Sequence, residues 1–460
     1  MAELLAAAPA TNFWTMDRVA AALGAGGNGP RGPLALRAIS TDTRSVHSGD
    51  LFVALSGERY DAHRFLSDAV ARGAVALVVS QPPRLHTVGV PAFVVADTLA
   101  ALGALARYRR RALGVPVIAV AGSNGKTSTK ELIRAALGGV LDVHATTANL
   151  NNLVGVPLTL LAAPNESELV VVELGTNAPG EIARLRAIAE PDITVLTSIG
   201  EEHLEGFGSL DGVLREEADA FSASGVAIVP SSQPEIADAA RRRACRVVTA
   251  GLEAGDVRAD RWGVNPDGSG WIEIDGETVR PPLFGEHNLR NAMLAIAVAR
   301  ECGVPMSAVS TGIARMAVPA MRTAFASLGA ATLINDAYNA NPASMRAALE
   351  LLEAVGAGRQ RVAVLGTMLE LGAQAGALHD EIARRALRSS LDVVAGVGEM
   401  GTALAAAGAG DARVVTAADI DTLWTALAPR LARDAVVLLK ASRGVQLERL
   451  VPHLTAWSQG

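Results

Sequence analysis

The sequence predicts an α/β protein of about three domains, with a doubly wound parallel sheet in the middle of the chain. Its 460 residues correspond to about three domains of common size, since a domain often has roughly 150 residues. Hydrophobic residues make up 50% of the chain, which is enough to fill buried cores. Two series of apolar segments alternate with helix-like segments, a pattern typical of parallel sheets covered by helices on both faces.

The N-terminal part of the chain is predicted to form a smaller α/β domain. Short apolar runs typical of strands occur at 50–55, 74–79 and 92–97. They are followed by an apolar periodicity that predicts a helix over 98–113. We therefore place the first domain at 1–113.

Regular alternation begins near residue 115 and predicts a central domain at 114–314. Continuous apolar segments separated by predicted helices lie at 115–122, 169–175, 193–200 and 225–230. A further helix is predicted over 287–304. Parallel strands joined by helices place their carboxyl ends along one crevice, which is where such sheets bind ligands.

A second alternating series predicts a C-terminal domain at 315–460. Its apolar segments lie at 332–338, 361–366, 391–398, 413–418 and 435–442, again with helices between them. Pro342 suits the first turn of a helix predicted over 344–355.

Composition and charge exclude several classes of function. The formal net charge is −6, with basic and acidic residues interspersed, so the chain offers no basic face for a nucleic acid. The cysteines Cys245 and Cys302 lack the spacing of a disulfide framework or a zinc site. The N-terminus lacks the features of a signal peptide, and no apolar run is long enough to span a bilayer. We expect a soluble cytoplasmic protein with no nucleic-acid or membrane partner.

The stretch VIAVAGSNGKTSTKE at 117–131 predicts a phosphate-binding loop. A strand would deliver a loop whose backbone N–H groups point inward, and the following helix would present its positive N-terminal end to phosphate. Lys126 would neutralise the β- and γ-phosphates, and the Thr127 hydroxyl would bind Mg²⁺. The full pattern has a further glycine where Val120 stands, so this loop is a shortened variant, and the alternative is a glycine-rich turn with a solvated lysine. The candidate nucleotide-binding residues are Gly122, Ser123, Asn124, Gly125, Lys126, Thr127 and Ser128.

Two side chains that follow predicted strands are candidates for a metal site. Nucleotide phosphates need a metal ion to spread the charge that develops in phosphoryl transfer. Glu173 lies at the end of the strand predicted at 169–175, and it would neighbour the Lys126 loop if the two strands are adjacent. His203 follows the next strand, among acidic residues. Taken alone, a glutamate at a strand end is more often solvated, and one loop histidine is weak evidence of a ligand.

Two further stretches place polar side chains next to apolar runs. TTANLNNLVGVPLTLL contains Thr146, Asn149, Asn151 and Asn152. INDAYNANPASM contains Asp336, Tyr338, Asn339 and Asn341. They are candidate binding residues, and the alternative is that they form turns and helix caps, which have the same composition.

Taken together, these stretches resemble the Mur ligase family. The motifs are GSNGKTSTKE, TTANLNNLVGVP, VELGTNAPGEI, SIGEEHLEGFGS, GEHNLRNAMLAIA, NDAYNANPASM and LGTMLELG, with STDTRSVHSGDLFVALSGERYDAHRF near the N-terminus. The resemblance covers essentially the whole chain. The phosphate loop indicates only the family, whereas NDAYNANPASM and GTNAPGEI are specific to one of its members.

The resemblance implies three domains and a reaction. The N-terminal domain would hold the UDP end of the substrate, the central domain would be an ATPase, and the C-terminal domain would be Rossmann-like and close over the nucleotide. The implied cofactors are ATP and Mg²⁺, and the implied substrates are UDP-N-acetylmuramoyl-tripeptide and D-alanyl-D-alanine. ATP would convert the terminal carboxylate of the tripeptide, a poor electrophile, to an acyl phosphate. The dipeptide amine would then displace phosphate, in the synthesis of peptidoglycan precursors.

The resemblance also implies roles for single residues. Lys126 and Thr127 would bind phosphate and Mg²⁺, with Glu173 and His203 as metal ligands. The adenine-side pair matches Asn288 and Asn291. Arg322 matches an arginine that reaches the γ-phosphate and Asp336 a ribose contact, and domain closure would bring both to the nucleotide and exclude water. The implied substrate-binding residues are Thr43, Arg44, Thr146, Asn149, Asn151, Tyr338, Asn339, Asn341, Lys440 and Arg443, with Ser442 in the same C-terminal motif.

The sequence departs from the family at a position that concerns the second metal ion. The family usually has a carbamylated lysine after FGS, and an ungapped alignment of SLDGVLREEADAF places Glu217 there. Glutamate offers similar oxygen ligands on a shorter arm. We hypothesise that Glu217, alone or with Glu216, replaces that lysine as a catalytic residue and metal ligand and frees the enzyme from CO₂. The alternative is an ordinary glutamate on a helix face. The implied catalytic residues are thus Lys126, His203, Glu217 and Arg322.

Thr367 and Ala441 also replace the family's Asp and Gly, and the sequence does not show what this changes.

Other functions remain open at this stage. The diaminopimelate-adding ligase carries an Asp-Asn-Pro-Arg tetrapeptide, which this sequence lacks, and folylpolyglutamate synthase shares the phosphate loop but not the N-terminal segment. A scaffold that had lost catalysis would need neither the metal ligands nor Arg322. A kinase that releases a phosphorylated product would require no amine acceptor. The third residue of the tripeptide stays open, and so does the oligomeric state, for which we expect a monomer although helix 98–113 could equally serve a dimer.

Overall fold

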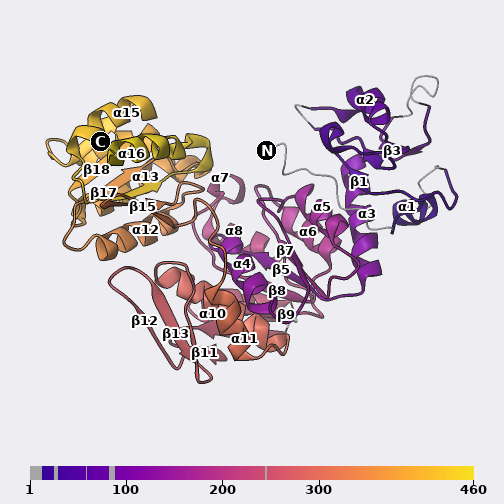
Figure 1. The fold of residues 1–460 in the computed structure, drawn as a ribbon, viewed down its shortest axis with the longest axis horizontal. Coiled ribbons are helices and arrows are strands. Elements are labelled where there is room, and N and C mark those ends of the chain that lie inside the picture. Colours follow the sequence, from indigo (N-terminus) through magenta and orange to yellow (C-terminus); the bar gives the residue numbers. More distant parts are fainter. Residues whose placement is uncertain (1–12, 25–29, 58–59, 82–88, 244–245, 460) are drawn as a thin grey trace.

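The computed structural model describes residues 13–24, 30–57, 60–81, 89–243 and 246–459. Cys245 and most of the N-terminal stretch discussed above lie outside these ranges. The chain forms three successive bodies, with the N-terminal and C-terminal bodies on opposite sides of the central one (Figure 1). Each body contains a parallel or mostly parallel sheet, so the predicted α/β fold is confirmed.

The N-terminal body is built on a four-stranded parallel sheet in the order β1-β2-β3-β4. The strands are β1 (Ile39–Ser40), β2 (Leu51–Val53), β3 (Ala76–Val79) and β4 (Ala92–Val94). The helices are α1 (Met16–Leu23), α2 (Leu66–Ala71) and α3 (Thr98–Leu113), with short 3₁₀ turns η2 (Thr43–Ser45) and η3 (Ala62–Phe65). The strand predictions and the helix at 98–113 are confirmed. Asp97 fixes the start of α3, because its side chain accepts hydrogen bonds from the N–H groups of Leu99 and Ala100.

Helix α3 connects the first two bodies through a shared core. One face of it packs on α1, and another packs on α5 (Gly155–Ala162) and α6 (Glu181–Ala189) of the central body. A single buried cluster contains Trp14 and Phe93 together with Leu102 of α3 and Leu160 of α5. The hydrophobic core is therefore continuous across the predicted boundary at residue 113.

The central body contains a seven-stranded parallel sheet in the order β11-β10-β9-β8-β5-β7-β6. The strands are β5 (Val117–Ala121), β6 (Val143–Ala145), β7 (Leu169–Glu173), β8 (Ile193–Leu196), β9 (Val226–Pro230), β10 (Arg246–Gly251) and β11 (Val257–Arg258). Helices α4 (Lys126–Leu137), α7 (Leu204–Phe207), α8 (Leu210–Ala218), α9 (Pro234–Arg242), α10 (Glu286–Glu301) and α11 (Met306–Ala314) complete it with α5 and α6. Alternate residues of β5 enter different cores: Ile118 packs with α4 and α10, whereas Ala119 packs with α3 and α5. The doubly wound arrangement is confirmed, and β6, β10 and β11 are additional to the predicted strands.

A small antiparallel sheet was missed by the sequence analysis. It consists of β12 (Arg261–Val264), β13 (Gly270–Ile274) and β14 (Glu277–Val279). It lies below α12 (Pro342–Val355) in Figure 1. The ring of Phe284, which follows this sheet, stacks on Phe325 of the C-terminal body, with 3.7 Å between the ring centroids.

The C-terminal body contains a six-stranded sheet in the order β15-β16-β20-β17-β18-β19. The strands are β15 (Ala324–Leu328), β16 (Ala331–Asn335), β17 (Arg361–Leu365), β18 (Val393–Val397), β19 (Val414–Ala417) and β20 (Val436–Lys440). They are joined by α12, α13 (Ala375–Arg388), α14 (Gly398–Ala407) and α15 (Ile420–Leu427), and α16 (Leu450–Gln459) ends the chain. All five predicted strands are confirmed, and the antiparallel edge strand β15 is additional. Helix α12 begins at Pro342, two residues before the predicted start.

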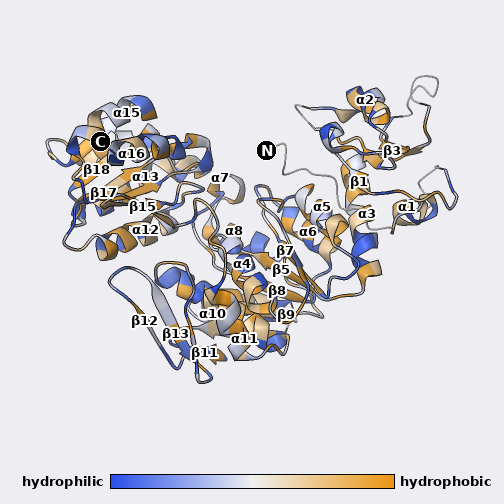
Figure 2. Ribbon diagram, in the orientation of Figure 1, coloured by the Kyte–Doolittle hydropathy of each residue, from blue (hydrophilic) through white to orange (hydrophobic). Residues whose placement is uncertain are grey.

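Hydropathy follows this layered architecture. Figure 2 shows hydrophobic residues concentrated in the sheets and on the helix faces that meet them, with hydrophilic residues on the outer faces. Within the described ranges, every helix is too short or too polar to cross a membrane.

Candidate active site

The largest group of predicted site residues lies in one cleft between the central and C-terminal bodies. The cleft has a volume of about 700 Å³. Its lining includes, from the candidate residues, Ser123, Asn124, Gly125, Lys126, Ser128, Asn149, Asn151, Glu173, His203, Asn288, Asn291, Arg322, Asp336, Tyr338, Asn339, Lys440 and Arg443. Segments separated by about 300 residues in sequence therefore face a common space, as the lining residues Lys126 and Lys440 illustrate.

The predicted phosphate loop joins β5 to α4. Gly122 has a φ of 115°, and a Cβ there would lie 2.5 Å from Thr197 Oγ1, so this position requires glycine. The loop is fixed on its neighbours: the N–H groups of Ser123 and Asn124 donate to the Ser198 carbonyl (2.8 Å) and hydroxyl (3.1 Å) oxygens. The prediction that these N–H groups point to the phosphate site is therefore wrong, because they are engaged within the protein. The first turn of α4, whose N–H groups have no intrahelical partners, offers the donors for a phosphate instead.

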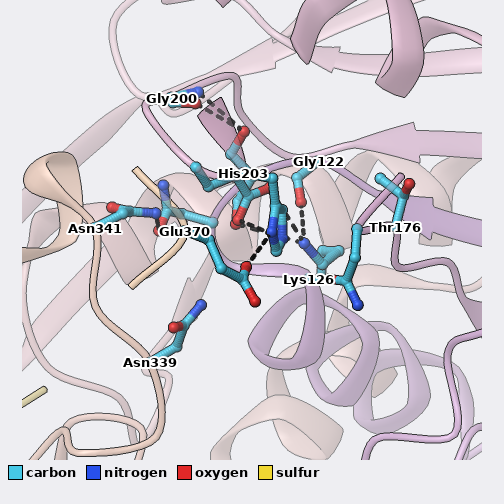
Figure 3. Close-up of polar contacts among 12 residues, drawn as sticks. Gly122, Lys126, Thr176, Gly200, His203, Asn339, Asn341 and Glu370 are labelled. Carbon is cyan, nitrogen blue, oxygen red and sulfur yellow. Dashed lines mark hydrogen bonds and ion pairs between the residues drawn. The ribbon is translucent and has the colours of Figure 1, made fainter. Parts of the chain in front are cut away.

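Lys126 lies at the centre of a group of carboxylates. Its Nζ donates to the Gly122 carbonyl at 2.5 Å and lies 3.6 Å from Glu202 Oε1 (Figure 3). Burial alone would lower the pKa of Lys126, but the charges of Glu202, Glu217 and Glu173 outweigh it and raise that pKa above its usual value. The ammonium group is therefore held in its charged form, as phosphate binding requires.

Glu173 and Thr127 meet because β5 and β7 are neighbours. Val120 pairs with Glu173 in the sheet, and Thr127 Oγ1 donates to Glu173 Oε2 at 2.9 Å. The other carboxylate oxygen accepts from Asn151 Nδ2 at 2.9 Å, and the Thr146 hydroxyl accepts from the Glu173 N–H at 3.0 Å. The sequence predicted that Glu173 would neighbour the Lys126 loop if their two strands were adjacent, and the strands are adjacent. Thr146 and Asn151 orient Glu173.

His203 lies at the junction of the two bodies. Its φ of 49° is in the left-handed region, and its Nδ1 forms an ion pair with Glu370 of the C-terminal body (Figure 3). Nε2 lies 3.9 Å from Glu202 Oε2. Burial alone would lower the pKa of His203, but the hydrogen bond that its ring donates to Glu370 and the charge of Glu202 raise it overall. A carboxylate on Nδ1 is the usual partner of a histidine whose Nε2 binds a metal ion.

Glu217 lies beneath the phosphate loop on α8. It is 1% exposed, and its Oε2 accepts a hydrogen bond from the Gly122 N–H at 2.7 Å. Burial, opposed by Lys126 and reinforced by the charge of Glu202, raises the pKa of Glu217 to about 7. Glu216, the predicted helper, points elsewhere, because its carboxylate accepts from the N–H groups of Gly180 and Ile182.

The donor set fits a divalent cation. Glu173, Glu217 and the Thr127 hydroxyl supply hard oxygen donors, which Mg²⁺ prefers, and one oxygen of the buried Glu202 has no hydrogen-bond partner within the described part of the chain. The described His, Cys, Asp and Glu side chains do not form a ready-made cluster of metal ligands. A metal ion here would therefore share its ligands with a bound phosphate, as Mg²⁺ commonly does.

The C-terminal body contributes basic and polar groups. The Arg322 guanidinium stacks over the Tyr338 ring, 4.2 Å from its centroid. Asp336 is bound by Lys440 Nζ at 2.5 Å and by the Thr323 N–H at 2.9 Å, so a ribose would have to share its carboxylate. Residues flanking Arg322 have positive φ, 57° at Met321 and 52° at Thr323, and this local strain is typical of functional segments.

The two asparagines predicted for the adenine side, Asn288 and Asn291, lie on α10, which packs against the phosphate-loop helix α4. Asn291 Nδ2 donates to Asn288 Oδ1 at 3.2 Å, and Asn288 Nδ2 donates to the Phe284 carbonyl at 2.9 Å. A Cβ on Gly125, whose φ is 82°, would lie 2.7 Å from Asn291 Oδ1. The loop and α10 therefore approach each other as closely as a glycine allows.

Some candidate residues lie outside the cleft lining. Thr43 and Arg44 belong to η2 of the N-terminal body. Asn341 caps α12, as the alternative interpretation of this residue predicted. Its Nδ2 also donates to Asn124 Oδ1 at 2.8 Å. Ser442 supports the loop before α13, since its Oγ accepts from the Leu369 N–H at 2.9 Å. Thr367 accepts from the Glu399 N–H at 3.0 Å and so fixes the start of α14.

Sequence reasoning missed two charged residues of the site. Glu202 lies inside the quoted motif SIGEEHLEGFGS, where two adjacent glutamates in a loop look solvated, yet it is only 5% exposed. Glu370 lies inside LGTMLELG, and it could be linked to His203 only once the two bodies are placed together. The signal that could have revealed both is their position inside motifs that were already singled out.

The fold and the cleft define a nucleotide-binding α/β protein of the phosphate-loop class, with basic residues from a second body facing the loop. The chain belongs to the Mur ligase family. Residues 36–110 match the catalytic-domain model of that family, 120–299 its middle-domain model and 321–443 its glutamate ligase domain model.

Curated relatives cover nearly the whole chain. The UDP-N-acetylmuramoyl-tripeptide–D-alanyl-D-alanine ligase of Bacillus subtilis is 35% identical over 91% of this chain and 93% of its own length. The ligase of the same name from Escherichia coli is 36% identical over the same shares.

Solved structures agree with this relationship. MurF from Acinetobacter baumannii superposes with a TM-score of 0.88 and 33% identity, covering 96% of this chain and 99% of that one. MurF ligase from Thermotoga maritima in complex with ADP gives a TM-score of 0.82 at 27% identity, covering 92% and 97%.

Proposed function

We propose that this protein is an ATP-dependent ligase that joins D-alanyl-D-alanine to the terminal carboxylate of UDP-N-acetylmuramoyl-tripeptide, in the synthesis of peptidoglycan precursors. The observation that carries the proposal is the cleft in which the Lys126 loop faces Arg322 and Lys440 of the C-terminal body. Two relatives bearing the name of this activity match over more than nine tenths of their length. Because ATP is a cytoplasmic nucleotide, we place the reaction in the cytoplasm, with the protein acting as a monomer.

The reaction begins with activation of a carboxylate. Transfer of the γ-phosphoryl group of ATP gives an acyl phosphate, in which phosphate has become the leaving group. The dipeptide amine attacks the carbonyl carbon, and the tetrahedral intermediate expels phosphate to form the amide. Bound Mg²⁺ would neutralise charge that develops on the phosphate oxygens.

Residues of the chain would position and stabilise these groups. Lys126 would bind the β- and γ-phosphates, and Thr127 with Glu173 and His203 would hold the metal ion. Arg322 would reach the γ-phosphate once it leaves the Tyr338 ring. Asn288 and Asn291 would line the adenine side, and Asp336 the ribose. Closing the cleft would exclude water, which otherwise hydrolyses the acyl phosphate.

We further propose the domain limits 1–113, 114–314 and 315–460, with the UDP end of the substrate held by the first domain near Thr43 and Arg44. The peptide end would then extend toward the side chains of Asn149, Asn151, Tyr338 and Asn339 in the cleft. Lys440 and Arg443 would lie near the incoming dipeptide.

For Glu217 we propose the role of the family's modified lysine, as a catalytic residue and metal ligand that needs no CO₂. Its burial beside the loop supports the proposal, and one oxygen is already committed to the Gly122 N–H. The Glu217→Ala variant tests this role. Unchanged Mg²⁺ dependence and unchanged turnover would contradict it.

The function is tested by phosphate release with ATP, Mg²⁺, the UDP-linked tripeptide and D-alanyl-D-alanine, leaving out each component in turn and weighing the nucleotide-sugar product. We expect release to need all four, and the product to gain the mass of the dipeptide. Release without the dipeptide would indicate a kinase, and use of single amino acids would indicate another member of the family. No turnover at all would favour a scaffold.

A further inference from the structure

The carboxylate of Glu202 is buried in the cleft without a complete set of partners. Its side chain is 5% exposed and lines the cleft. Oε1 accepts no hydrogen bond from any described residue; its neighbour is Lys126 Nζ at 3.6 Å. Oε2 lies 3.9 Å from His203 Nε2. Burial raises the pKa of Glu202, and leaving one of its oxygens unpaired in such a place is unfavourable. A ligand that is absent from the free protein could supply the missing partner.

The charge of a second buried carboxylate acts on the same lysine from another element. Glu217 on α8 is 1% exposed and accepts from the Gly122 N–H at 2.7 Å, whereas Glu202 approaches from the loop after β8. The charges of Glu202, Glu217 and Glu173 all act on Lys126. In the free protein, the ammonium group of Lys126 is therefore the shared counter-charge of these carboxylates.

Nucleotide binding would remove this compensation. The inference rests on the proposed function, in which Lys126 serves the β- and γ-phosphates. Once its ammonium is committed to phosphate, Glu202 and Glu217 can stay ionised only beside another cation, because unpaired buried charges are strongly destabilising. Carboxylate oxygens suit a hard divalent ion such as Mg²⁺.

We propose that Glu202 is a further ligand of the active site, which with Glu217 binds a divalent cation when the nucleotide engages Lys126. Glu202 therefore has two partners in turn, the Lys126 ammonium in the free protein and the metal ion in the nucleotide complex. The cation, Mg²⁺ or Mn²⁺, is the family's second metal ion, for which Glu217 is proposed above as a ligand, and the new element is Glu202 as a further ligand of it.

The test is a count of bound Mn²⁺ on the full chain, from the electron paramagnetic resonance signal of the free ion, at saturating non-hydrolysable ATP analogue. The Glu202→Gln variant keeps the shape of the side chain and removes its charge. Glu205→Gln is the matched control, since Glu205 is an exposed glutamate of the next helix, α7. Calorimetry with the same analogue measures nucleotide binding in parallel.

We expect wild type and Glu205→Gln to bind one Mn²⁺ more per chain than Glu202→Gln. An equal number and affinity in all three proteins would overturn the inference. If Glu202→Gln does not fold, Glu202→Asp replaces it. A Mn²⁺ affinity more than about 100-fold weaker exceeds the loss caused by residues that only orient metal ligands and supports a direct role, and a smaller loss or none overturns it. Failure of the wild type to bind the analogue would instead overturn the proposed function, and this inference with it.

Discussion

Lys126 and its buried carboxylate neighbours form a group of charged side chains. The ammonium lies 3.6 Å from Glu202 Oε1, and its pKa is raised because Glu202, Glu217 and Glu173 outweigh the effect of burial. Such a group is stable only while its charges compensate one another. Single substitutions here should therefore change both ligand binding and the response of the free protein to pH.

Replacing Lys126 with Ala should lower turnover by about 10²-fold or more, the scale for losing one donor to charge that develops in a transition state. Nucleotide affinity should fall as well. Phosphate release and calorimetry with ADP measure the two effects. Arg134→Ala is the control, because Arg134 lies on the exposed face of the same helix, paired with Glu131. Equal turnover in the two variants would contradict the role of Lys126.

The pKa of Glu217, raised from 4.5 to about 7, predicts how the nucleotide-free protein responds to pH. Between about pH 4.5 and 7 the folded protein retains a proton that the unfolded chain has lost, so the free energy of unfolding falls as pH rises through this window. Glu217→Gln should flatten this part of the profile of melting temperature against pH. Scanning calorimetry from pH 5 to 8 checks this, with Glu205→Gln as a reference; parallel profiles for wild type and Glu217→Gln would show that Glu217 does not titrate there.

At the scale of single residues, the sequence could predict only those positions that local secondary structure fixes. Glu173 was predictable as a partner of the loop, because a strand fixes where its last residue lies and neighbouring parallel strands end together. Glu202 and Glu370 were not, because the side chains they pair with, Lys126 and His203, lie on other segments whose relative position no local pattern encodes. Asn341 was predicted with both interpretations open, and it serves as a cap and as a contact to Asn124.

Among the elements, α12 contacts the phosphate loop through its N-terminal cap. Its N-terminus is a capping box, in which Asn341 and Ser344 exchange side-chain and backbone hydrogen bonds, with Pro342 in the first turn. The same Asn341 side chain donates to Asn124 Oδ1 at 2.8 Å. The helix cap of one body therefore also holds the loop of another.

Asn341→Ala should destabilise the protein by about 1 kcal/mol, the usual cost of losing an N-cap side chain. Asp419→Ala is the matched control, since Asp419 caps α15 with a hydrogen bond from the Thr422 N–H. Urea unfolding should show similar losses for both variants. Only Asn341→Ala should also raise the KM for ATP, and an unchanged KM would show that the contact with Asn124 is not needed.

The small antiparallel sheet shows why an element can be missed although its signal is present. β13 and β14 are joined by Asp275 and Gly276, both with positive φ, 53° and 78°, which is the Asp-Gly turn of a tight hairpin. The strands β12 and β14 are short, with four and three residues, and the surrounding alternation of parallel strands and helices dominated the interpretation. A search for two-residue turns would have found this hairpin.

At the scale of the whole molecule, polar contacts hold the C-terminal body against the central one. His203 pairs with Glu370, Arg346 Nη2 lies 3.2 Å from Glu201, and Asn341 donates to Asn124. Leu204 and Val213 of the central body enter a hydrophobic cluster of the C-terminal body. The interface is thus partly polar, which suits a surface that opens and closes during turnover.

Arg346→Ala should shift the protein toward more open forms. A half-exposed ion pair contributes about 0.2–1 kcal/mol, so we expect the KM for ATP to rise by about two- to fivefold. Small-angle scattering without nucleotide should give a larger radius of gyration. Arg384→Ala, which removes an exposed pair within α13, serves as control, and identical scattering from both variants would contradict the role of the Arg346 contact.

The overall organisation was predictable because each body has its own alternating series of strands and helices. Their mutual placement was not, because the contacts between them involve single side chains from distant segments, such as Phe284 with Phe325. The cleft follows from that placement.

The core that continues through α3 affects how pieces of this protein can be exchanged or produced separately. A fragment cut after residue 113 would leave Leu102 and its neighbours without the α5 and α6 surfaces that cover them, and exposed apolar helix faces promote aggregation. Chimaeras with a foreign N-terminal body should therefore inherit α3 together with the surfaces of α5 and α6. The interface of the C-terminal body is partly polar, so we expect this body to tolerate replacement as a module better than the N-terminal body.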